Sequence, residues 1–158
     1  MVEHVLYEVD MFRRCFTRWR ALNEDHSDWN PTLESSLLHF RVLREFFLSP
    51  APKYEDDVLA CDYITHTQWK PSQHKIFAET KEEIDKRLAH LTTRRLQPPV
   101  LWKRGEMEAA VEELVASFKS SLRDPVSGWF AKLETGRLQA VSAQDVSVST
   151  ATEIKYDR

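Results

Sequence analysis

Two arginines and a histidine stand three and four residues apart in one stretch of this chain, at Arg87, His90 and Arg94. In a helix these side chains form one row beside the apolar residues Leu88 and Leu91. Two guanidinium groups can hold a phosphate through paired hydrogen bonds, and an imidazole can transfer a proton near neutral pH. The row therefore predicts either a phosphate-handling site or a structural edge whose arginines pair with Asp or Glu from an adjacent segment.

Arg44 is the second residue whose surroundings are unusual. It falls inside the apolar face of a helix predicted from Pro31 to Leu48, and His39 lies toward the other side of that face. An unpaired charge there would be costly, so an anionic group should meet it. Glu45 is expected to lie on the wrong side of the helix. The expected partners belong to the following segment: Asp56, Asp57 and Asp62.

These residues define one candidate polar cluster between the second and third helices. It consists of His39, Arg44, Asp56, Asp57, Arg87, His90 and Arg94. We expect at least one of the aspartates Asp56 and Asp57 to contact Arg44 or Arg94, because like charges brought together need a carboxylate between them.

Other site chemistries have less support in the residues. Asp62 and His66 are the one local pair with ligand spacing, and no Glu-x-x-His pair accompanies them, so no metal site is expected. The first 104 residues contain no glycine, which excludes a P-loop or a dinucleotide-binding fingerprint there. Cys15 and Cys61 have no recognisable base near them in sequence. We expect no cofactor.

Composition sets the class of protein. The chain has 158 residues, 42% of them hydrophobic and 30% charged, which suits one compact domain. The net charge of −3 offers no basic field for duplex DNA. No apolar run approaches the roughly 20 residues that span a bilayer. The two cysteines do not form a disulfide framework, so a cytoplasmic protein without membrane contact is expected.

Apolar spacing predicts an all-α fold, an up-and-down bundle of four main helices plus a short helix. The long helices are expected over Val2–Leu22, over Pro31–Leu48 with Asn30 as N-cap, from a Ser72 cap to Pro98, and from the turn at 103–105 to Asp124. The short one should lie within Tyr54–Ile64, with Asp56 or Asp57 as its cap. Residues 1–133 form the predicted helical domain, and residues 134–158 a flexible or extended C-terminal tail.

The helix faces carry further expectations. Val5, Val9, Phe12, Phe16 and Trp19 form a core-facing stripe. Four arginines lie off this stripe and are expected to face solvent: Arg13, Arg14, Arg18 and Arg20. Leu38, Val42 and Phe46 add apolar residues around the second helix, which is therefore predicted to be the most enclosed one. In the fourth helix Glu108 and Glu112 are expected opposite the apolar stripe.

Three stretches, 34–47, 56–60 and 86–94, resemble an uncharacterised group of bacterial helical proteins whose architecture is similar to that of the HEPN superfamily. Many HEPN proteins are dimeric RNases whose motif is an arginine followed, after four to six residues, by a histidine. This chain departs from the motif, because only two residues separate Arg87 from His90. Arg20 and His26 have acceptable spacing, but Ala21 stands where the motif prefers a polar residue. The resemblance thus implies a bundle and a dimer more than RNase activity.

Two functions follow as predictions. The first is a small cytoplasmic binding protein that acts as a homodimer and whose polar cluster is mainly architectural. The alternative is a HEPN-like RNase, or an enzyme that binds nucleotide phosphate, with RNA or another phosphate-containing ligand held by the arginines and histidines. The sequence identifies no substrate.

Overall fold

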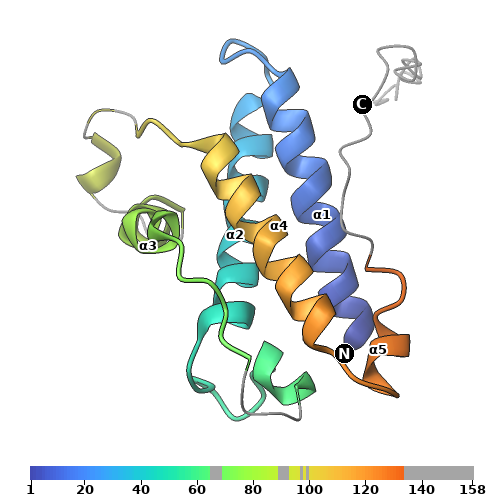
Figure 1. Ribbon diagram of the computed structural model, residues 1–158. Helices are drawn as coiled ribbons and strands as arrows, with labels where there is room; N and C mark the ends of the chain where they lie inside the picture. The colour runs from blue at the N-terminus through green and yellow to red at the C-terminus, as the bar shows by residue number, and fades with distance from the viewer. Residues whose placement is uncertain (65–68, 89–92, 97, 99, 134–158) are drawn as a thin grey trace, which may run out of the picture.

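The structure, a computed structural model, describes residues 1–64, 69–88, 93–96, 98 and 100–133, and Figure 1 shows its arrangement. It has five α-helices: α1 (Val2–Ala21), α2 (Trp29–Leu48), α3 (Lys75–Leu88), α4 (Arg104–Ser121) and the short α5 (Val126–Trp129). Two short 3-10 helices, η1 (Ala60–Tyr63) and η2 (Thr93–Leu96), lie between them. These ranges contain no strand, and the predicted all-α fold with four main helices is confirmed.

Three long helices lie side by side and the fourth crosses them. Figure 1 shows α1, α2 and α4 packed along their lengths, whereas α3 is seen nearly end-on against α2 and α4. The chain runs along α2 and α4 in one direction and along α1 in the opposite direction. The region of α3 and η2 therefore returns the chain to the end of the bundle where α4 begins. Of the helices in the described part, none combines the length and apolar composition needed to cross a bilayer.

The core follows the predicted apolar stripes. All five stripe residues of α1 are buried: Val5, Val9, Phe12, Phe16 and Trp19. The stripe of α4 is buried too, and its Phe118 ring lies 5.2 to 5.7 Å from the rings of Phe130, Phe47 and Phe46. Such edge-on aromatic contacts add to the free energy gained from apolar burial.

The predicted starts of the second and third helices were wrong, because neither helix has the predicted N-cap residue. Helix α2 begins at Trp29 after the N-cap Asp28, not after Asn30, and Asp28 makes no side-chain capping bond. The carboxylate of Asp28 instead accepts a hydrogen bond from Arg18. Helix α3 begins at Lys75, three residues after the predicted cap Ser72, and its described part ends at Leu88. Residues 134–158, the predicted tail, lie outside the described residues.

The predicted short helix is only the four-residue η1. Neither Asp56 nor Asp57 caps it: Asp57 accepts hydrogen bonds from the backbone N–H groups of Lys53 and Tyr54, each at 2.8 Å. Asp62 accepts the N–H of Leu59 at 2.8 Å and so occupies the capping role. Pro50 and Pro52 lie upstream of this stretch, and the carboxylates there stabilise turns in place of a longer helix. Helix α5 was not predicted.

Helix α2 is the most enclosed of the long helices, as predicted: it has nine buried residues, against seven in α4, five in α1 and four in α3. Two of its apolar residues are nevertheless open to solvent, because Leu38 is 53% exposed and Val42 is 37% exposed.

On α1, Arg14 and Arg18 are exposed as predicted, but Arg13 and Arg20 turn toward α4. There they pair with Glu112 and Glu108, which were expected to face solvent.

Candidate functional site

His39 and Arg44 lie on the same helix, but different neighbours hold them. The imidazole Nδ1 of His39 is 2.7 Å from Oε2 of Glu8 on α1, and the Tyr7 ring contacts the imidazole edge-on at 6.2 Å. Arg44 reaches in the direction of α3. The structure therefore does not bring these two predicted site residues into one site, and the buried His39 is tied into the contact between α1 and α2.

The predicted partners of Arg44 were wrong. Its Nη2 lies 2.5 Å from Oε1 of Glu45 and 3.8 Å from Oδ1 of Asp85. Among the described residues it makes no ion pair with Asp56, Asp57 or Asp62, whereas Asp57 and Asp62 accept backbone hydrogen bonds in their own turns. Glu45 was expected to point away from Arg44. Both side chains are long and flexible, however, so the half-exposed Glu45 carboxylate can bend back to the Arg44 guanidinium.

The predicted row on the third helix is only partly within the described residues. Arg87 donates to Oε2 of Glu83 at 2.7 Å and to the backbone carbonyl of Pro98 at 3.2 Å. The carboxylate partner of Arg87 lies on α3 itself and not on an adjacent segment as predicted, and the bond to Pro98 ties the end of α3 to the chain that follows it. His90 and the side chain of Arg94 lie outside the described part, so their predicted contacts remain predictions.

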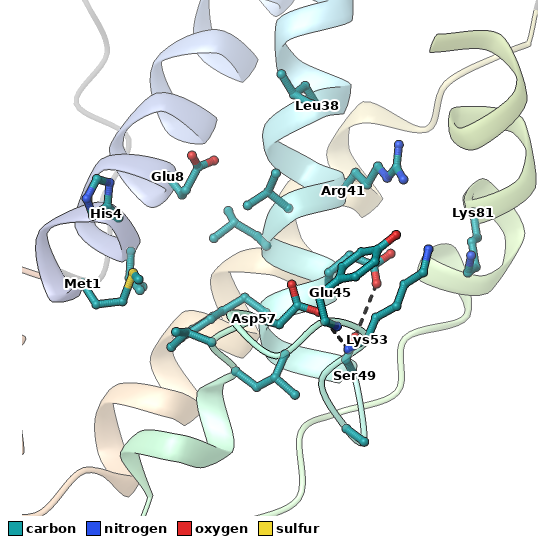
Figure 2. Close-up of a pocket in the computed structure, with 18 of the residues that line it drawn as sticks. Met1, His4, Glu8, Leu38, Arg41, Glu45, Ser49, Lys53, Asp57 and Lys81 are labelled. Carbon is teal, nitrogen blue, oxygen red and sulfur yellow. Dashed lines mark hydrogen bonds between the residues drawn. The ribbon is translucent and has the colours of Figure 1, made fainter. Parts of the chain in front are cut away.

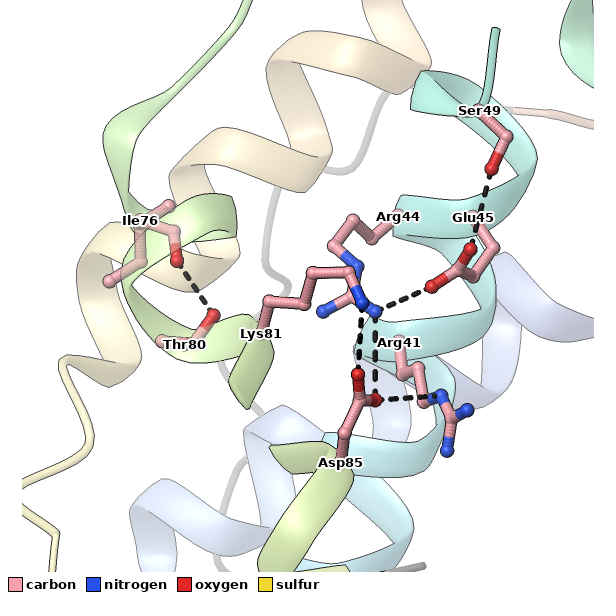
Figure 3. A network of polar contacts seen from close by, with 8 residues as sticks. All are labelled: Arg41, Arg44, Glu45, Ser49, Ile76, Thr80, Lys81 and Asp85. Carbon is pink, nitrogen blue, oxygen red and sulfur yellow. Dashed lines mark hydrogen bonds and ion pairs between the residues drawn. The ribbon is translucent and has the colours of Figure 1, made fainter. Parts of the chain in front are cut away.

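A polar cluster lies between α2 and α3, where one was predicted. Of the predicted residues whose side chains the structure describes, however, only Arg44 belongs to it. Three cations converge on the Asp85 carboxylate, as Figure 3 shows. Arg41 Nε lies 3.2 Å from Oδ1, Lys81 Nζ 3.0 Å from Oδ2, and Arg44 Nη2 3.8 Å from Oδ1. We call these four residues, with Glu45, the α2–α3 cluster. The spacing Arg41-Arg44 and the pair Lys81-Asp85 were the available sequence signals.

The electrostatics of Asp85 reflect this crowd of cations. Burial alone would raise its pKa, but the hydrogen bond from Lys81 and the positive charges of Arg41, Lys81 and Arg44 together outweigh burial and lower the pKa. Asp85 is therefore ionised near neutral pH. Its buried Oδ1 accepts no hydrogen bond within the described part, although Arg41 Nε is 3.2 Å away, so that contact is an ion pair without hydrogen-bond geometry.

A pocket of about 740 Å³ opens beside the cluster. Figure 2 shows α1 on one side with Met1, His4 and Glu8, and α3 on the other side with Lys81. Helix α2 and the 49–59 segment form the floor and the end. Apolar side chains line the middle, among them Leu38, Val42, Phe46 and Leu59. The cations Arg41, Lys53 and Lys81 lie at the end near α3 (Figure 2). This end of the pocket is therefore positively charged, whereas the middle is apolar.

Neither a metal centre nor a disulfide is evident in the described ranges. Groups of three or more His, Cys, Asp or Glu side chains placed to hold a metal ion do not occur there. Cys15 and Cys61 are both free thiols.

No family model, curated protein or solved structure matches this chain. The likeness to HEPN proteins therefore stays a prediction from sequence, and the function must be inferred from the geometry of the molecule itself.

Proposed function

We propose that this protein acts by binding, and that it pairs with a second copy of itself through the outer face of α1 and α2. We call this surface the α1–α2 face and define it by Tyr7, Leu38 and Val42. The single observation that carries the proposal is the exposure of Leu38, 53%, in the middle of a 20-residue helix. Val42, one turn further on, is 37% exposed, and Tyr7 on α1 is 54% exposed. Apolar groups clustered on two packed helices favour an interface.

The charges of α1 favour a second copy as the partner. On the side of α1 that carries Tyr7, the first half of the helix has the exposed acidic residues Glu3 and Asp10 and the second half has the exposed basic residues Arg14 and Arg18. Three other charged residues are paired with α2 or α4 instead: Glu8, Arg13 and Arg20. A two-fold axis across the middle of the helix would place the acidic half of each copy against the basic half of the other. The same patch is then complementary to itself, as a two-fold interface requires.

The remaining observations agree with a binding role more than with catalysis. His39, the one histidine of the predicted cluster whose side chain is described, is held by Glu8 and is buried. Both cysteines are free, which fits the reducing conditions of a cytoplasmic location. No contact among the described residues favours the RNase alternative.

Sedimentation velocity over a range of protein concentrations tests the proposal. We expect the wild-type protein to be a dimer and the Leu38→Glu variant to be a monomer, because a carboxylate would have to be desolvated in the interface. Leu38 is half exposed, so the variant should keep the wild-type circular dichroism spectrum. Leu101→Glu is the matched control: Leu101 is 92% exposed and lies away from the α1–α2 face.

The control variant should dimerise like the wild type. A wild-type protein that stays monomeric at high micromolar concentration would overturn the proposal. So would a Leu38→Glu variant that dimerises as strongly as Leu101→Glu.

A further inference from the structure

The α2–α3 cluster holds more positive than negative charge. Arg41, Arg44 and Lys81 contribute three positive charges, and Asp85 and Glu45 contribute two negative ones. Glu45 is only half committed to the cluster, because its side chain is 50% exposed and its second oxygen accepts a hydrogen bond from Ser49 at 3.3 Å. One carboxylate, Asp85, thus serves three cations, and at least one positive charge lacks a counter-charge within the cluster (Figure 3).

A fourth cation faces the same end of the pocket. The Lys53 ammonium lies 5.1 Å from the centre of the Tyr54 ring and makes no ion pair within the described residues. The nearby carboxylate of Asp57 accepts the backbone N–H groups of Lys53 and Tyr54, which occupies one of its oxygens in the turn. With Lys53 and Asp57 included, four cations still face only three carboxylates at this end of the pocket.

Arg44 supplies an independent sign that an acceptor belongs here. Its side chain is 6% exposed, and its buried Nη1 has no hydrogen-bond partner among the residues that the structure describes. Buried guanidinium donors are normally paired, since a buried donor without an acceptor is unfavourable. Figure 3 shows this guanidinium reaching from α2 toward α3, into the space bordered by Lys81 and Asp85. Arg44 itself does not line the pocket, whereas its neighbours in the cluster, Arg41 and Lys81, do.

We propose that this end of the pocket binds a phosphate group, with Arg41 and Lys81 as its direct ligands and the buried Arg44 as a third positive charge behind them. Phosphate at neutral pH carries between one and two negative charges and several acceptor oxygens, which matches the surplus of positive charge. Guanidinium groups bind it through paired N–H donors, and the lysine adds a point charge. The apolar residues Phe46 and Leu59 also line this pocket, so the organic part of a phosphate monoester would lie against them. All the residues of the cluster belong to one copy of the chain.

Titration with phenyl phosphate and with inorganic phosphate, in a low-salt chloride buffer, tests the site. Amide chemical shifts of isotope-labelled protein report where each ligand binds, and calorimetry gives the affinity. We expect saturable binding at up to millimolar concentration, with the largest shifts at residues 41–45 and 81–85. Tighter binding of phenyl phosphate would identify a monoester as the ligand, whereas equal affinity would identify the free ion. Either result supports the phosphate site.

Two variants and a matched control assign the residues. Arg41→Gln and Lys81→Gln should each weaken binding by about tenfold, because each removes a charge-assisted hydrogen bond. Lys75→Gln is the control: Lys75 lies on the same helix as Lys81 and also pairs with an acid four residues on, but outside the pocket. It should bind like the wild type. Arg44 is left unchanged, since its burial makes a folding defect difficult to separate from a binding defect.

Absence of saturable shifts in the wild type would overturn the proposal. Equal weakening by Lys75→Gln would also overturn it, because the binding would then reflect overall charge. The oligomeric state measured with Leu38→Glu is a separate result, so failure of the dimer and failure of the phosphate site can be told apart.

Discussion

Two contacts between helices use arginine and carboxylate side chains in opposite ways. Between α1 and α4 the charges pair one to one: Arg13 binds Glu112 through two hydrogen bonds of 2.7 and 2.8 Å, and Arg20 binds Glu108 at 2.9 Å. Between α2 and α3 three cations share Asp85. Matched pairs are sufficient to explain a packed contact, whereas surplus cations at the edge of a pocket are typical of a binding site.

The two central carboxylates feel these environments differently. Glu108 has a side chain only 9% exposed, and burial raises its pKa, opposed by Arg20 and reinforced by the charge of Glu112. Asp85 is 26% exposed, and its three cations lower its pKa in spite of burial. The single cation near Glu108 therefore does not offset the effect of burial on its pKa. The three cations near Asp85 more than offset the effect of burial there.

The largest effect is expected from breaking the one-to-one contact. Arg20→Ala should lower the free energy of unfolding by about 2–3 kcal/mol, because it leaves the buried Glu108 carboxylate without its cation. Urea denaturation followed by tryptophan fluorescence measures this change. Arg14→Ala is the control, since Arg14 is 73% exposed and pairs with an exposed Asp10, and it should change the free energy by about 0.5 kcal/mol or less. Equal losses in both variants would contradict the comparison.

A smaller loss is expected at Arg44, although Arg44 is the more buried arginine. In Arg44→Ala, Asp85 keeps Arg41 and Lys81, and Glu45 can turn to solvent, so no buried carboxylate is stranded. The loss of about 1–2 kcal/mol should come from the packing of the side-chain stem. Arg44→Met retains most of that stem and should recover stability in the same denaturation assay. If Arg44→Met is as unstable as Arg44→Ala, the charge of Arg44 itself stabilises the fold.

The sequence predicted what depends on period and composition. The stripe of α1 was correct at every position because a helical repeat needs only local spacing, and the burial of Arg44 followed from the same projection. The partner of Arg44 did not follow from the sequence. Asp85 is 41 residues away, and the two residues meet only because of how α2 packs against α3 in the tertiary structure. The same reason hid the pairing of Arg20 with Glu108, 88 residues apart.

The exposure of two apolar residues on α2 was not predicted, for a related reason. Leu38 and Val42 are apolar, and apolar residues all around a helix normally indicate burial on every side. In the folded chain α1, α3 and α4 cover the other faces and leave this one open. A single chain cannot reveal from its pattern whether such a face is covered by its own helices or by a partner.

The pH dependence of stability should have opposite signs at the two carboxylates. The folded pKa of Glu108 lies above its ordinary value of 4.5, so the native state holds a proton that the unfolded chain has released in the window above 4.5. The stability of the wild type relative to Glu108→Gln should therefore fall as pH rises through that window.

At Asp85 the sign reverses. Its folded pKa lies below the ordinary value of 3.8, so its contribution is complete above 3.8 and is lost as pH falls below that value. The stability of the wild type relative to Asp85→Asn should decrease on acidification. Urea denaturation of the wild type, Glu108→Gln and Asp85→Asn between mildly acidic and strongly acidic pH measures both differences. Slopes of the same sign would show that burial governs both carboxylates alike.

The smallest change in stability is expected for Lys81→Gln. This variant tests whether Lys81 is needed for the stability of the fold or is a cation that the fold can lose. Lys81 is 59% exposed and pairs with Asp85 one turn away, a kind of contact that contributes little. After Lys81→Gln the carboxylate still has Arg41 and Arg44 within 4 Å, and the repulsion among the cations is reduced. The free energy of unfolding should therefore change by less than about 0.5 kcal/mol, as for Lys75→Gln in the same assay. A loss above about 1.5 kcal/mol would mean that the fold needs all three cations, and the charge available to a ligand would disappear with it.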